Sequence, residues 1–302
     1  MPLKLTILGS GSAVPNLNRG VSAQYLNFNE RRILIDCGEG TQLQLRKFKI
    51  KFQRLQYIFI SHLHGDHFLG IFGLISSMNL LGRDNKLTIF APVGLEEIIR
   101  HQFKLTEVYL GFELEFITVD PTEKTKIFED DKLNIYAFPL QHRIPCNGFL
   151  FEEKAKEHKI RKSAISKYNL SLVEILALKK GQNVMRDEIT IKNEDCTLPP
   201  EKSLQFAYCS DTKYLPRLTD WIEGADLLYH EATFLTAHKS RAKATGHSTA
   251  AQAATIAKDA KVGKLLLGHF SARYKDTVEL LAEAIGVFDN VVCVEDGQAF
   301  KL

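Results

Sequence analysis

The stretch Ser61-His62-Leu63-His64-Gly65-Asp66-His67 decides the fold, and it directly follows the apolar run at 57–60. Three imidazoles and one carboxylate lie close together here, at a density that core packing does not explain. His62 and His64 are two positions apart, so an extended or turning backbone points both rings the same way. Asp66 and His67 can open a following helix and face a second ion. The stretch therefore predicts a binuclear metal site, and a solvated histidine cluster is the alternative.

The ligand chemistry narrows the choice of metal. Imidazole nitrogen with some carboxylate oxygen suits zinc best, and manganese, cobalt or iron fit the same ligand set. One cluster cannot fill the shells of two ions, so further donors are expected at the ends of later strands. Strand patterns at 134–140, 204–210 and 264–268 are followed by the three further candidate donors, His142, Asp211 and His269. A lone histidine of this kind is more often a core or surface residue, but three donors in equivalent positions favour one shared site.

Other segments carry a resemblance to known proteins. Those that resemble a broad superfamily are 5–13, 35–42, the histidine stretch, His142 and Ser210-Asp211-Thr212. Two more, His230-Glu231-Ala232-Thr233 and His247-Ser248-Thr249, are typical of one family within it. The chain thus resembles the metallo-β-lactamase superfamily and, within it, ribonuclease Z, the endonuclease that matures the 3′ end of transfer RNA. The resemblance covers nearly the whole chain and implies an α/β (α+β) fold, a four-layer αββα sandwich.

The resemblance also implies roles for individual residues. One zinc ion would be held by His62, His64 and His142, the other by Asp66, His67 and His269, and Asp211 would bridge them. Asp66 is in addition the family's proposed proton acceptor. His247, kept protonated by Glu231, looks like the acid that protonates the ribose 3′-oxygen as it leaves. Alternatively, His247 caps the helix expected at 248–260.

The remaining histidines are expected to have no ligand role. His230 is interpreted as a residue of the core or of the surroundings of the metal ligands. His101, His158 and His238 are expected at the surface.

Length and composition limit the classes of protein to which the chain can belong. A chain of 302 residues with 45% apolar content can form one large core, and we expect a single domain over 1–302 with an insertion. The five cysteines are scattered and form no Cys-x-x-Cys pair, which argues for reduced thiols and against thiolate zinc. The sequence contains neither a signal-peptide pattern nor an apolar run long enough to cross a bilayer. A cytoplasmic protein without membrane attachment is expected.

Apolar periodicity predicts two mixed halves. The first half is expected to contain strands at 3–9, 21–28, 31–38, 87–92, 113–119, 125–128, 133–140 and 148–152, with helices at 39–49, 66–82 and 94–105. The second half is expected to contain strands at 204–210, 226–231, 264–268 and 291–295, with helices at 214–225, 248–260 and 276–288. Two strand-rich halves with outer helices fit the four-layer sandwich.

The segment 154–202 breaks this alternation and is interpreted as an inserted flexible arm. Between 154 and 192 it carries ten lysines and arginines against four acids, a net charge of +6, so the rest of the chain is at −3. A basic arm of this kind is expected in a protein that binds the phosphate backbone of a nucleic acid. A solvated insertion without a partner is the alternative. The candidate RNA-binding residues are Lys159, Arg161, Lys162, Lys179 and Lys180.

The resemblance assigns this arm to the elbow of transfer RNA. The family's usual glycine-proline motif is absent, and Asn169-Leu170-Ser171-Leu172 stands in its place. A second basic run from Arg46 to Arg54 is a further candidate for an RNA surface or a dimer face, and an ordinary exposed helix end is equally compatible with it.

The sequence as a whole predicts a zinc-dependent endoribonuclease with two zinc ions. It would remove the 3′ trailer from precursor tRNA, leaving a 3′-hydroxyl on the tRNA and a 5′-phosphate on the trailer. By resemblance to the family, the enzyme would be a homodimer. One alternative is a metallo-hydrolase of a small thioester, lactone or phosphodiester, which needs neither the Glu231–His247 pair nor the basic arm. Another is a binding protein with an inactive metal site, which has no chemical reason to keep all seven ligands.

Overall fold

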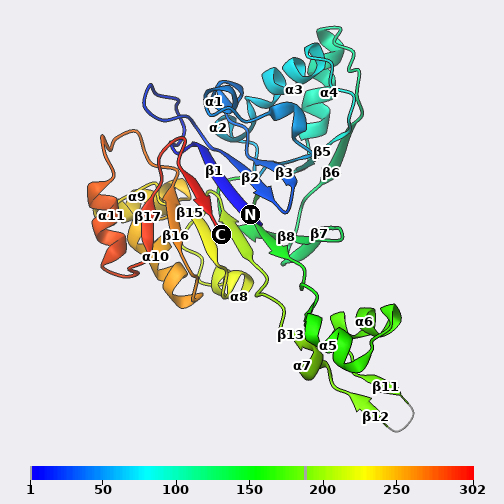
Figure 1. The fold of residues 1–302 in the computed structure, drawn as a ribbon. Coiled ribbons are helices and arrows are strands. Elements are labelled where there is room, and N and C mark those ends of the chain that lie inside the picture. The colour runs from blue at the N-terminus through cyan, green and yellow to red at the C-terminus, as the bar shows by residue number, and fades with distance from the viewer. Residues whose placement is uncertain (1, 187–188) are drawn as a thin grey trace.

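The computed structural model describes residues 2–186 and 189–302, and two seven-stranded sheets dominate it (Figure 1). The first sheet has the order β18-β1-β2-β3-β4-β5-β6 and is antiparallel from β18 to β3 and parallel from β3 to β6. Its strands are β1 (Leu3–Gly9), β2 (Ala23–Phe28), β3 (Arg31–Ile35), β4 (Tyr57–Phe59), β5 (Leu87–Ala91), β6 (Leu114–Thr118) and β18 (Ala299–Lys301).

The second sheet has the order β17-β16-β15-β14-β9-β8-β7. Strands β14 to β17 are parallel, and β7, β8, β9 and β14 pair in antiparallel fashion. Its strands are β7 (Thr125–Glu129), β8 (Leu133–Leu140), β9 (Cys146–Glu153), β14 (Gln205–Cys209), β15 (Leu227–Glu231), β16 (Leu265–Gly268) and β17 (Val291–Cys293).

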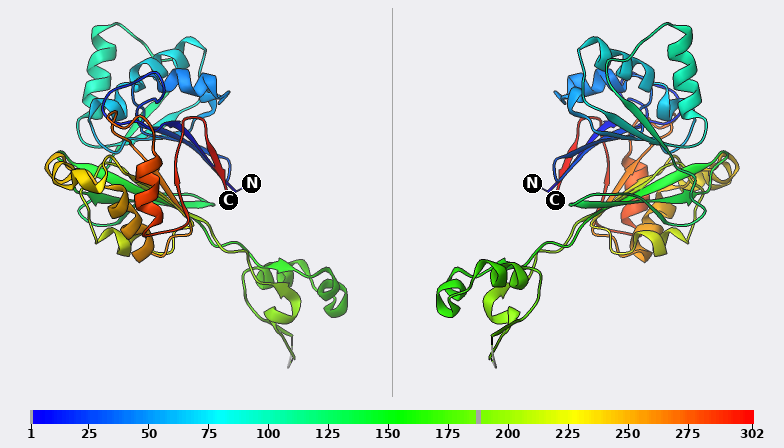
Figure 2. Two further views of the ribbon diagram at one scale, coloured as in Figure 1. Left: turned by 90° about the vertical axis from the view of Figure 1, so that its left-hand side faces the viewer. Right: turned by 90° about the vertical axis from the view of Figure 1, so that its right-hand side faces the viewer.

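The two sheets pack face to face through an aromatic core. Phe59 of the first sheet contacts Phe149 and Phe151 of the second, with ring centroids 5.3 and 5.5 Å apart. Helices α1 (Thr41–Lys47), α3 (Ile71–Leu80) and α4 (Leu95–Leu105) cover the outer face of the first sheet. Helices α8 (Leu218–Ile222), α10 (Ala250–Asp259) and α11 (Val278–Ile285) cover that of the second. The predicted four-layer αββα arrangement is confirmed (Figure 2).

Three details differ from the sequence-based expectation. The helix expected at 66–82 is two helices, α2 (Gly65–Phe68) and α3, because the Gly70 N–H donates to the carbonyl of Cys37 at 2.9 Å. A Cβ at Gly70 would lie 2.1 Å from the carbonyl oxygen of Gly38, so this close approach requires glycine. The strands expected near 125–152 belong to the second sheet, not to the first half. The helix expected at 214–225 begins only at Leu218, since Pro216 disfavours helical backbone at the preceding residue.

Other elements were not predicted. Strand β18 returns to the first sheet beside β1, and the short helix α9 (Lys239–Thr245) precedes α10. No helix within the described residues is both long and apolar enough to cross a lipid bilayer.

The insertion projects from the second sheet between β9 and β14 (Figures 1 and 2). It contains β10 (Lys159–Ile160), α5 (Lys162–Tyr168), α6 (Leu172–Lys179), β11 (Val184–Arg186), β12 (Ile189–Ile191), α7 (Asn193–Cys196) and β13 (Thr197–Leu198). These elements surround a small apolar cluster that includes Leu178 and Ile191. Asp187 and Glu188, two of the four acids in its net charge, lie outside the described residues.

The segment that replaces the glycine-proline motif forms a tight turn between α5 and α6. Asn169 ends α5 with a φ of 46°, a left-handed conformation that asparagine tolerates better than most residues. Ser171 then caps α6 in a capping box with Glu174. Glu174 also accepts from Arg186 Nε at 2.5 Å, which ties the turn to β11. Local capping thus makes this part of the arm a defined turn.

Candidate metal centre and general acid

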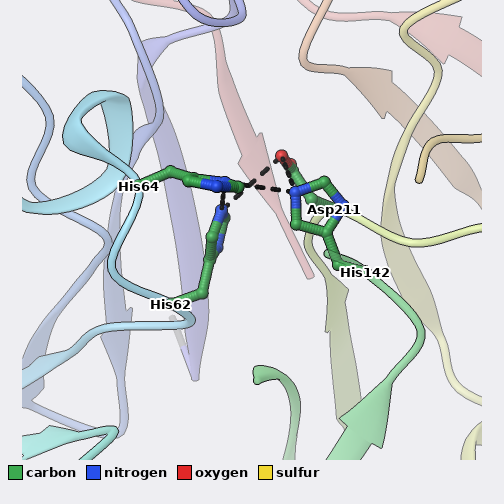
Figure 3. A group of neighbouring side chains, drawn as sticks. All are labelled: His62, His64, His142 and Asp211. Carbon is green, nitrogen blue, oxygen red and sulfur yellow. Dashed lines mark hydrogen bonds and ion pairs between the residues drawn. The ribbon is translucent and has the colours of Figure 1, made fainter. Parts of the chain in front are cut away.

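The seven predicted ligands come together where strands of both sheets end. His62 and His64 follow β4, and Asp66 and His67 lie on α2. The remaining three follow strands of the second sheet, His142 after β8, Asp211 after β14 and His269 after β16. Figure 3 shows the first group converging from separate segments of the chain. Because a functional group at the end of each strand faces the same edge, residues distant in sequence share one site.

The first group is formed by three histidines and Asp211. His64 Nδ1 lies 3.0 Å from His62 Nε2 and 3.1 Å from His142 Nε2. Asp211 Oδ2 lies 3.6 Å from His62 Nε2 and 3.7 Å from His142 Nε2. All four donor atoms therefore face a common point.

The second group uses the other oxygen of Asp211. His67 Nε2 and His269 Nε2 are 3.2 Å apart, and Asp66 Oδ2 lies 3.5 and 3.4 Å from them. Asp211 Oδ1 lies 3.5 Å from His67 Nε2 and 3.2 Å from His269 Nε2. One carboxylate thus presents one oxygen to each group, as a bridging ligand would.

These distances fit a pair of small divalent cations. Tetrahedral zinc bonds of about 2.0–2.2 Å hold neighbouring ligand atoms roughly 3.3–3.6 Å apart, close to the separations of both groups. Asp211 Oδ1 is buried and has no hydrogen-bond partner within residues 2–186 and 189–302, which is costly for a carboxylate unless a cation lies beside it. The donors are imidazole nitrogens and carboxylate oxygens, a set that suits zinc and also manganese, cobalt or iron.

The second nitrogen of several rings is held by a neighbouring group. His62 Nδ1 lies 3.0 Å from Ser61 Oγ, and His142 Nδ1 lies 2.7 Å from the carbonyl oxygen of Gly246. His269 Nδ1 lies 2.9 Å from Thr233 Oγ1. Such contacts fix the ring orientation before any cation binds.

Asp36 performs the same task for His67, and sequence reasoning did not assign it a role. It is fully buried, and its Oδ2 lies 2.7 Å from both His67 Nδ1 and the hydroxyl of Tyr208. Oδ1 accepts from the backbone N–H of Ser61 at 2.7 Å. The available signal was a carboxylate directly after an apolar strand, the pattern that singled out Asp211.

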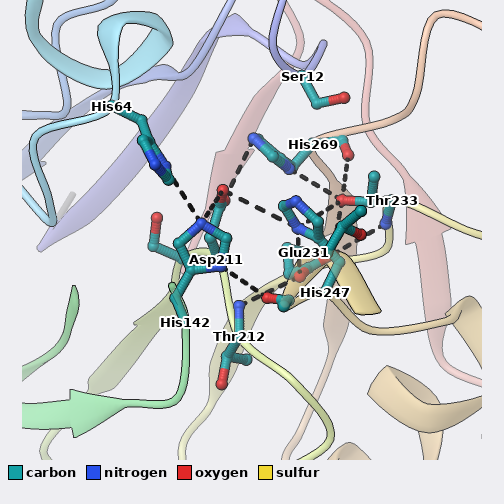
Figure 4. Close-up of polar contacts among 12 residues, drawn as sticks. Ser12, His64, His142, Asp211, Thr212, Glu231, Thr233, His247 and His269 are labelled. Carbon is teal, nitrogen blue, oxygen red and sulfur yellow. Dashed lines mark hydrogen bonds and ion pairs between the residues drawn. The ribbon is translucent and has the colours of Figure 1, made fainter. Parts of the chain in front are cut away.

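Glu231 and His247 form an ion pair beside the two ligand groups, as Figure 4 shows. His247 Nδ1 lies 3.0 Å from Glu231 Oε1. Glu231 is fully buried and accepts further hydrogen bonds from the backbone N–H groups of Thr212, Thr233 and Ser248. The residue that caps α10 is Thr249, so the alternative role of His247 as a helix cap is wrong.

The pair is held in its charged form. Burial alone would raise the pKa of Glu231, but the positive charge and hydrogen bond of His247 lower that pKa to about 2. Burial alone would lower the pKa of His247, but Glu231 raises it to about 9. Near neutral pH, His247 therefore carries a proton that it can donate.

His247 and members of both ligand groups line one cavity of about 460 Å³, and these ligands are His64, Asp66, His142, Asp211 and His269. Arginines also line it, namely Arg143, Arg241 and Arg273. At its rim, the backbone N–H of Ala13 donates to Asp66 Oδ2 at 2.7 Å. Asp296 holds the loop of Ala13 at both ends, accepting from the N–H groups of Ser10 and Gly20 at 3.0 and 2.7 Å. The cavity combines cation ligands, a proton donor and positive charge, which suits an anionic phosphodiester.

The candidate RNA-binding residues lie on the arm, outside this cavity, and three of them are engaged in local contacts. Lys159 pairs with Glu201, and Lys179 pairs with Glu157 at 2.6 Å. Arg161 Nε donates to the carbonyl oxygen of Thr197 at 3.1 Å. Lys162 and Lys180 are exposed at the surface of the arm. The arm thus offers exposed positive charge but no part of the metal pocket.

The histidines without a predicted ligand role fall largely where expected. His230 is buried in the core, and its Nδ1 donates to the carbonyl oxygen of Glu231 at 2.7 Å. His101 and His238 are exposed. His158 is half-buried inside the arm, where its Nδ1 lies 3.1 Å from Thr197 Oγ1, so its assignment to the open surface was wrong.

Comparisons with known proteins identify the family. The family model of the Anti-Pycsar protein Apyc1 matches residues 3–198, and that of the beta-lactamase superfamily domain matches residues 197–270. Ribonuclease Z of Bacteroides fragilis is 43% identical over 300 residues, which cover 99% of both chains. Ribonuclease Z of Cytophaga hutchinsonii is 46% identical over 303 residues, covering 99% of this chain and 96% of that protein. The chain belongs to the ribonuclease Z family.

Solved structures agree with this membership in the ribonuclease Z family. Human tRNase Z, short form (ELAC1), is 30% identical and superimposes with a TM-score of 0.73 over 99% of this chain and 98% of that one. The metallo-beta-lactamase fold protein YhfI from Bacillus subtilis is 20% identical with a TM-score of 0.70, a similarity of fold.

Proposed function

We propose that this member of the ribonuclease Z family is a zinc-dependent endoribonuclease that removes the 3′ trailer from precursor tRNA. The observation that carries this proposal is His247, which lies 3.0 Å from the buried Glu231 and lines the same cavity as members of both ligand groups. Hydrolysis of a small thioester or lactone does not require a separate strong proton donor, whereas departure of a ribose 3′-oxygen does. Human tRNase Z, as its name states, acts on tRNA, and its likeness supports the same substrate class here.

Two divalent cations, when bound, would neutralise charge on the scissile phosphate and lower the pKa of a water molecule. His62, His64 and His142 would hold one cation and Asp66, His67 and His269 the other, with Asp211 between them. Ser61, Asp36, Gly246 and Thr233 keep the rings aimed at these positions. The protein thereby provides a rigid ligand set that needs little rearrangement during the reaction.

The reaction moves two protons. The oxygen of a water molecule forms a bond to phosphorus while the bond from phosphorus to the ribose 3′-oxygen breaks. Asp66 accepts the proton of the attacking water, and His247 donates its proton to the departing oxygen. The products are a 3′-hydroxyl on the tRNA and a 5′-phosphate on the trailer.

The arm supplies a second, separate contact in this proposal. Its exposed basic side chains, Lys162 and Lys180 among them, would bind phosphates of the tRNA body while the cavity acts on the 3′ junction. A homodimer and a cytoplasmic location remain predictions. Sedimentation equilibrium on the purified protein tests the first, and fractionation of cells that produce the protein tests the second.

A direct assay tests the proposal. Purified protein with zinc is incubated with a transcript of a tRNA that carries a 3′ trailer, and the ends of both products are determined. We expect cleavage at the junction, with a 3′-hydroxyl and a 5′-phosphate, and loss of cleavage in a chelator. Absence of cleavage together with rapid hydrolysis of a small thioester or lactone would overturn the proposal in favour of the small-molecule alternative.

A further inference from the structure

A second cavity of about 510 Å³ adjoins the metal pocket, and His247 lines both. Helix α9 is the ridge between them: Arg241 and Thr245 line the metal pocket, whereas Lys239 and Lys243 line the second cavity. The other walls of the second cavity include Gln141, which follows β8, and Lys213 and Tyr214, which follow β14. Among the described residues, those that line the second cavity include three lysines and an aromatic ring but no carboxylate.

The positions of the attacking and leaving oxygens indicate which side of the cleaved bond faces each cavity, and this step rests on the proposed function. In an in-line displacement at phosphorus, the attacking and leaving oxygens lie on opposite sides. Asp66 accepts the proton of the attacking water and lines only the metal pocket. His247 protonates the leaving 3′-oxygen, so the ribose that carries this oxygen lies against His247. The strand on the 5′ side of that ribose then continues beyond His247, where the second cavity opens.

The lining of the second cavity matches a nucleotide. Lysine side chains bind phosphate, and an aromatic ring stacks on a base of any identity. Its volume lies within the usual range for small-ligand sites. Tyr214 is partly buried against the core, which holds its ring in place. Lys239 and Lys243 are exposed on one side of α9 and stand one turn apart.

We propose that the second cavity binds the last nucleotide of the tRNA body, the one whose 3′-oxygen leaves. Its base stacks on Tyr214, and the phosphate on its 5′ side lies between Lys239 and Lys243. The first trailer nucleotide lies in the metal pocket, toward Arg143 and Arg273. The two nucleotides that flank the cleaved bond are thus recognised on opposite sides of His247.

Base removal tests which nucleotide Tyr214 contacts. Cleavage is measured for Tyr214→Leu, which keeps apolar packing, and Tyr214→Phe, which keeps the aromatic face. The substrates are an intact precursor, one without the base of the last tRNA nucleotide, and one without the base of the first trailer nucleotide. We expect Tyr214→Leu to lower kcat/KM about tenfold to a hundredfold on the intact precursor and on the trailer-modified one. On the precursor lacking the last tRNA base it should have no further effect, and Tyr214→Phe should cleave each substrate about as fast as the unsubstituted protein does.

Binding of the cleaved RNA provides a readout independent of chemistry. Lys239→Ala with Lys243→Ala should weaken binding of product tRNA with a free 3′-hydroxyl and flatten the log-log salt dependence by roughly 0.7–0.9 for each phosphate that is no longer neutralised. The matched control is Lys258→Ala, which replaces an exposed lysine near the C-terminal end of α10. Thermal unfolding of each variant verifies the fold.

Two outcomes would overturn this proposal. Coupling of Tyr214 to the first trailer base would assign the cavity to the opposite side of the junction. Equal effects of Tyr214→Leu on all three substrates would mean that the ring contacts neither base. Failure of the unsubstituted protein to cleave any precursor would instead contradict the proposed function, so the two failures are distinguishable.

Discussion

The metal pocket and the arm differ in how their charged side chains are held. At the pocket, Asp211 is 3% exposed, and Asp36 and Glu231 behind it are fully buried and accept hydrogen bonds from other segments of the chain. In the arm, Lys162 and Lys180 stand at the surface of a small unit built around its own apolar cluster. Hydrolysis needs charges that are oriented and shielded from water, whereas attraction of a polyanion needs only exposed cations. The proposed chemistry would therefore depend on the whole fold, and the proposed contact of the arm with RNA would be separable from it.

The strongest test of this separation removes the shared ligand. Asp211→Ala should lower hydrolysis of both precursor tRNA and bis(p-nitrophenyl) phosphate by on the order of ten thousandfold, because both ligand groups lose an oxygen. Metal analysis should show more than one equivalent per chain for the unsubstituted protein and clearly less metal for the variant. Asp259→Ala, an exposed carboxylate at the end of α10, is the control. A limit of one equivalent in the unsubstituted protein would contradict the binuclear site.

Replacing the proton donor should affect the hydrolysis rates of the two substrates differently. His247→Ala should slow cleavage of precursor tRNA about 100-fold to 10,000-fold, the usual contribution of general acid catalysis. Hydrolysis of bis(p-nitrophenyl) phosphate should be largely spared, since its leaving group needs no proton. His101→Ala, an exposed histidine on α4, is the matched control. Equal losses on both substrates would reject the donor role.

The charge of Glu231 should determine the alkaline limb of the pH–rate profile. A general acid must carry its proton, so cleavage falls as the pH rises through the pKa of His247, which Glu231 raises to about 9. In Glu231→Gln this pKa should move down toward the ordinary 6.5, so cleavage at pH 8 falls roughly thirtyfold and the limb shifts to lower pH. Rates of precursor cleavage between pH 6 and 10 measure the shift, and an unchanged limb would exclude this electrostatic role.

Removal of the arm should have the smallest effect on chemistry. Deletion of residues 158–198, bridged by a short glycine linker, removes β10 to β13 together and leaves all seven ligands in place. Affinity for precursor tRNA should fall on the order of tenfold, with a salt slope flatter by roughly 0.7–0.9 per phosphate that the arm neutralises, while hydrolysis of bis(p-nitrophenyl) phosphate stays unchanged. Parallel salt dependences would mean that RNA is held elsewhere. Lys49→Ala with Lys51→Ala then tests the run from Arg46 to Arg54.

Sequence reasoning picked out residues that the structure brings together where polar side chains are dense in a short segment or directly follow an apolar strand. The stretch 61–67 and the donors His142, Asp211 and His269 stand out because a polar ligand directly after an apolar run has few packing explanations. The four-layer arrangement came from family resemblance, since periodicity alone does not distinguish it from a doubly wound sheet.

The missed features depend on contacts between distant segments. Strand β18 has little apolar pattern of its own and forms because β1 offers a free edge. The break between α2 and α3 depends on the approach of Gly38 to Gly70. Asp36 matters because of where His67 and Tyr208 lie in the fold. Neither propensity nor periodicity contains such information.

The hydrogen bonds by which Asp296 holds Ser10 and Gly20 have a consequence during protein synthesis. Asp296 follows Ser10 by 286 positions in the sequence. The ribosome therefore makes Asp296 on the order of 15 to 60 s after it has made Ser10. Until then, one edge of β1 lacks β18, and the Ala13 loop beside Asp66 lacks its anchor. A nascent chain thus carries most of the proposed metal ligands long before Asp296 is made. The Ala13 loop beside Asp66 therefore stays without this anchor until Asp296 has been made, and the bare strand edge is exposed to aggregation for the same interval.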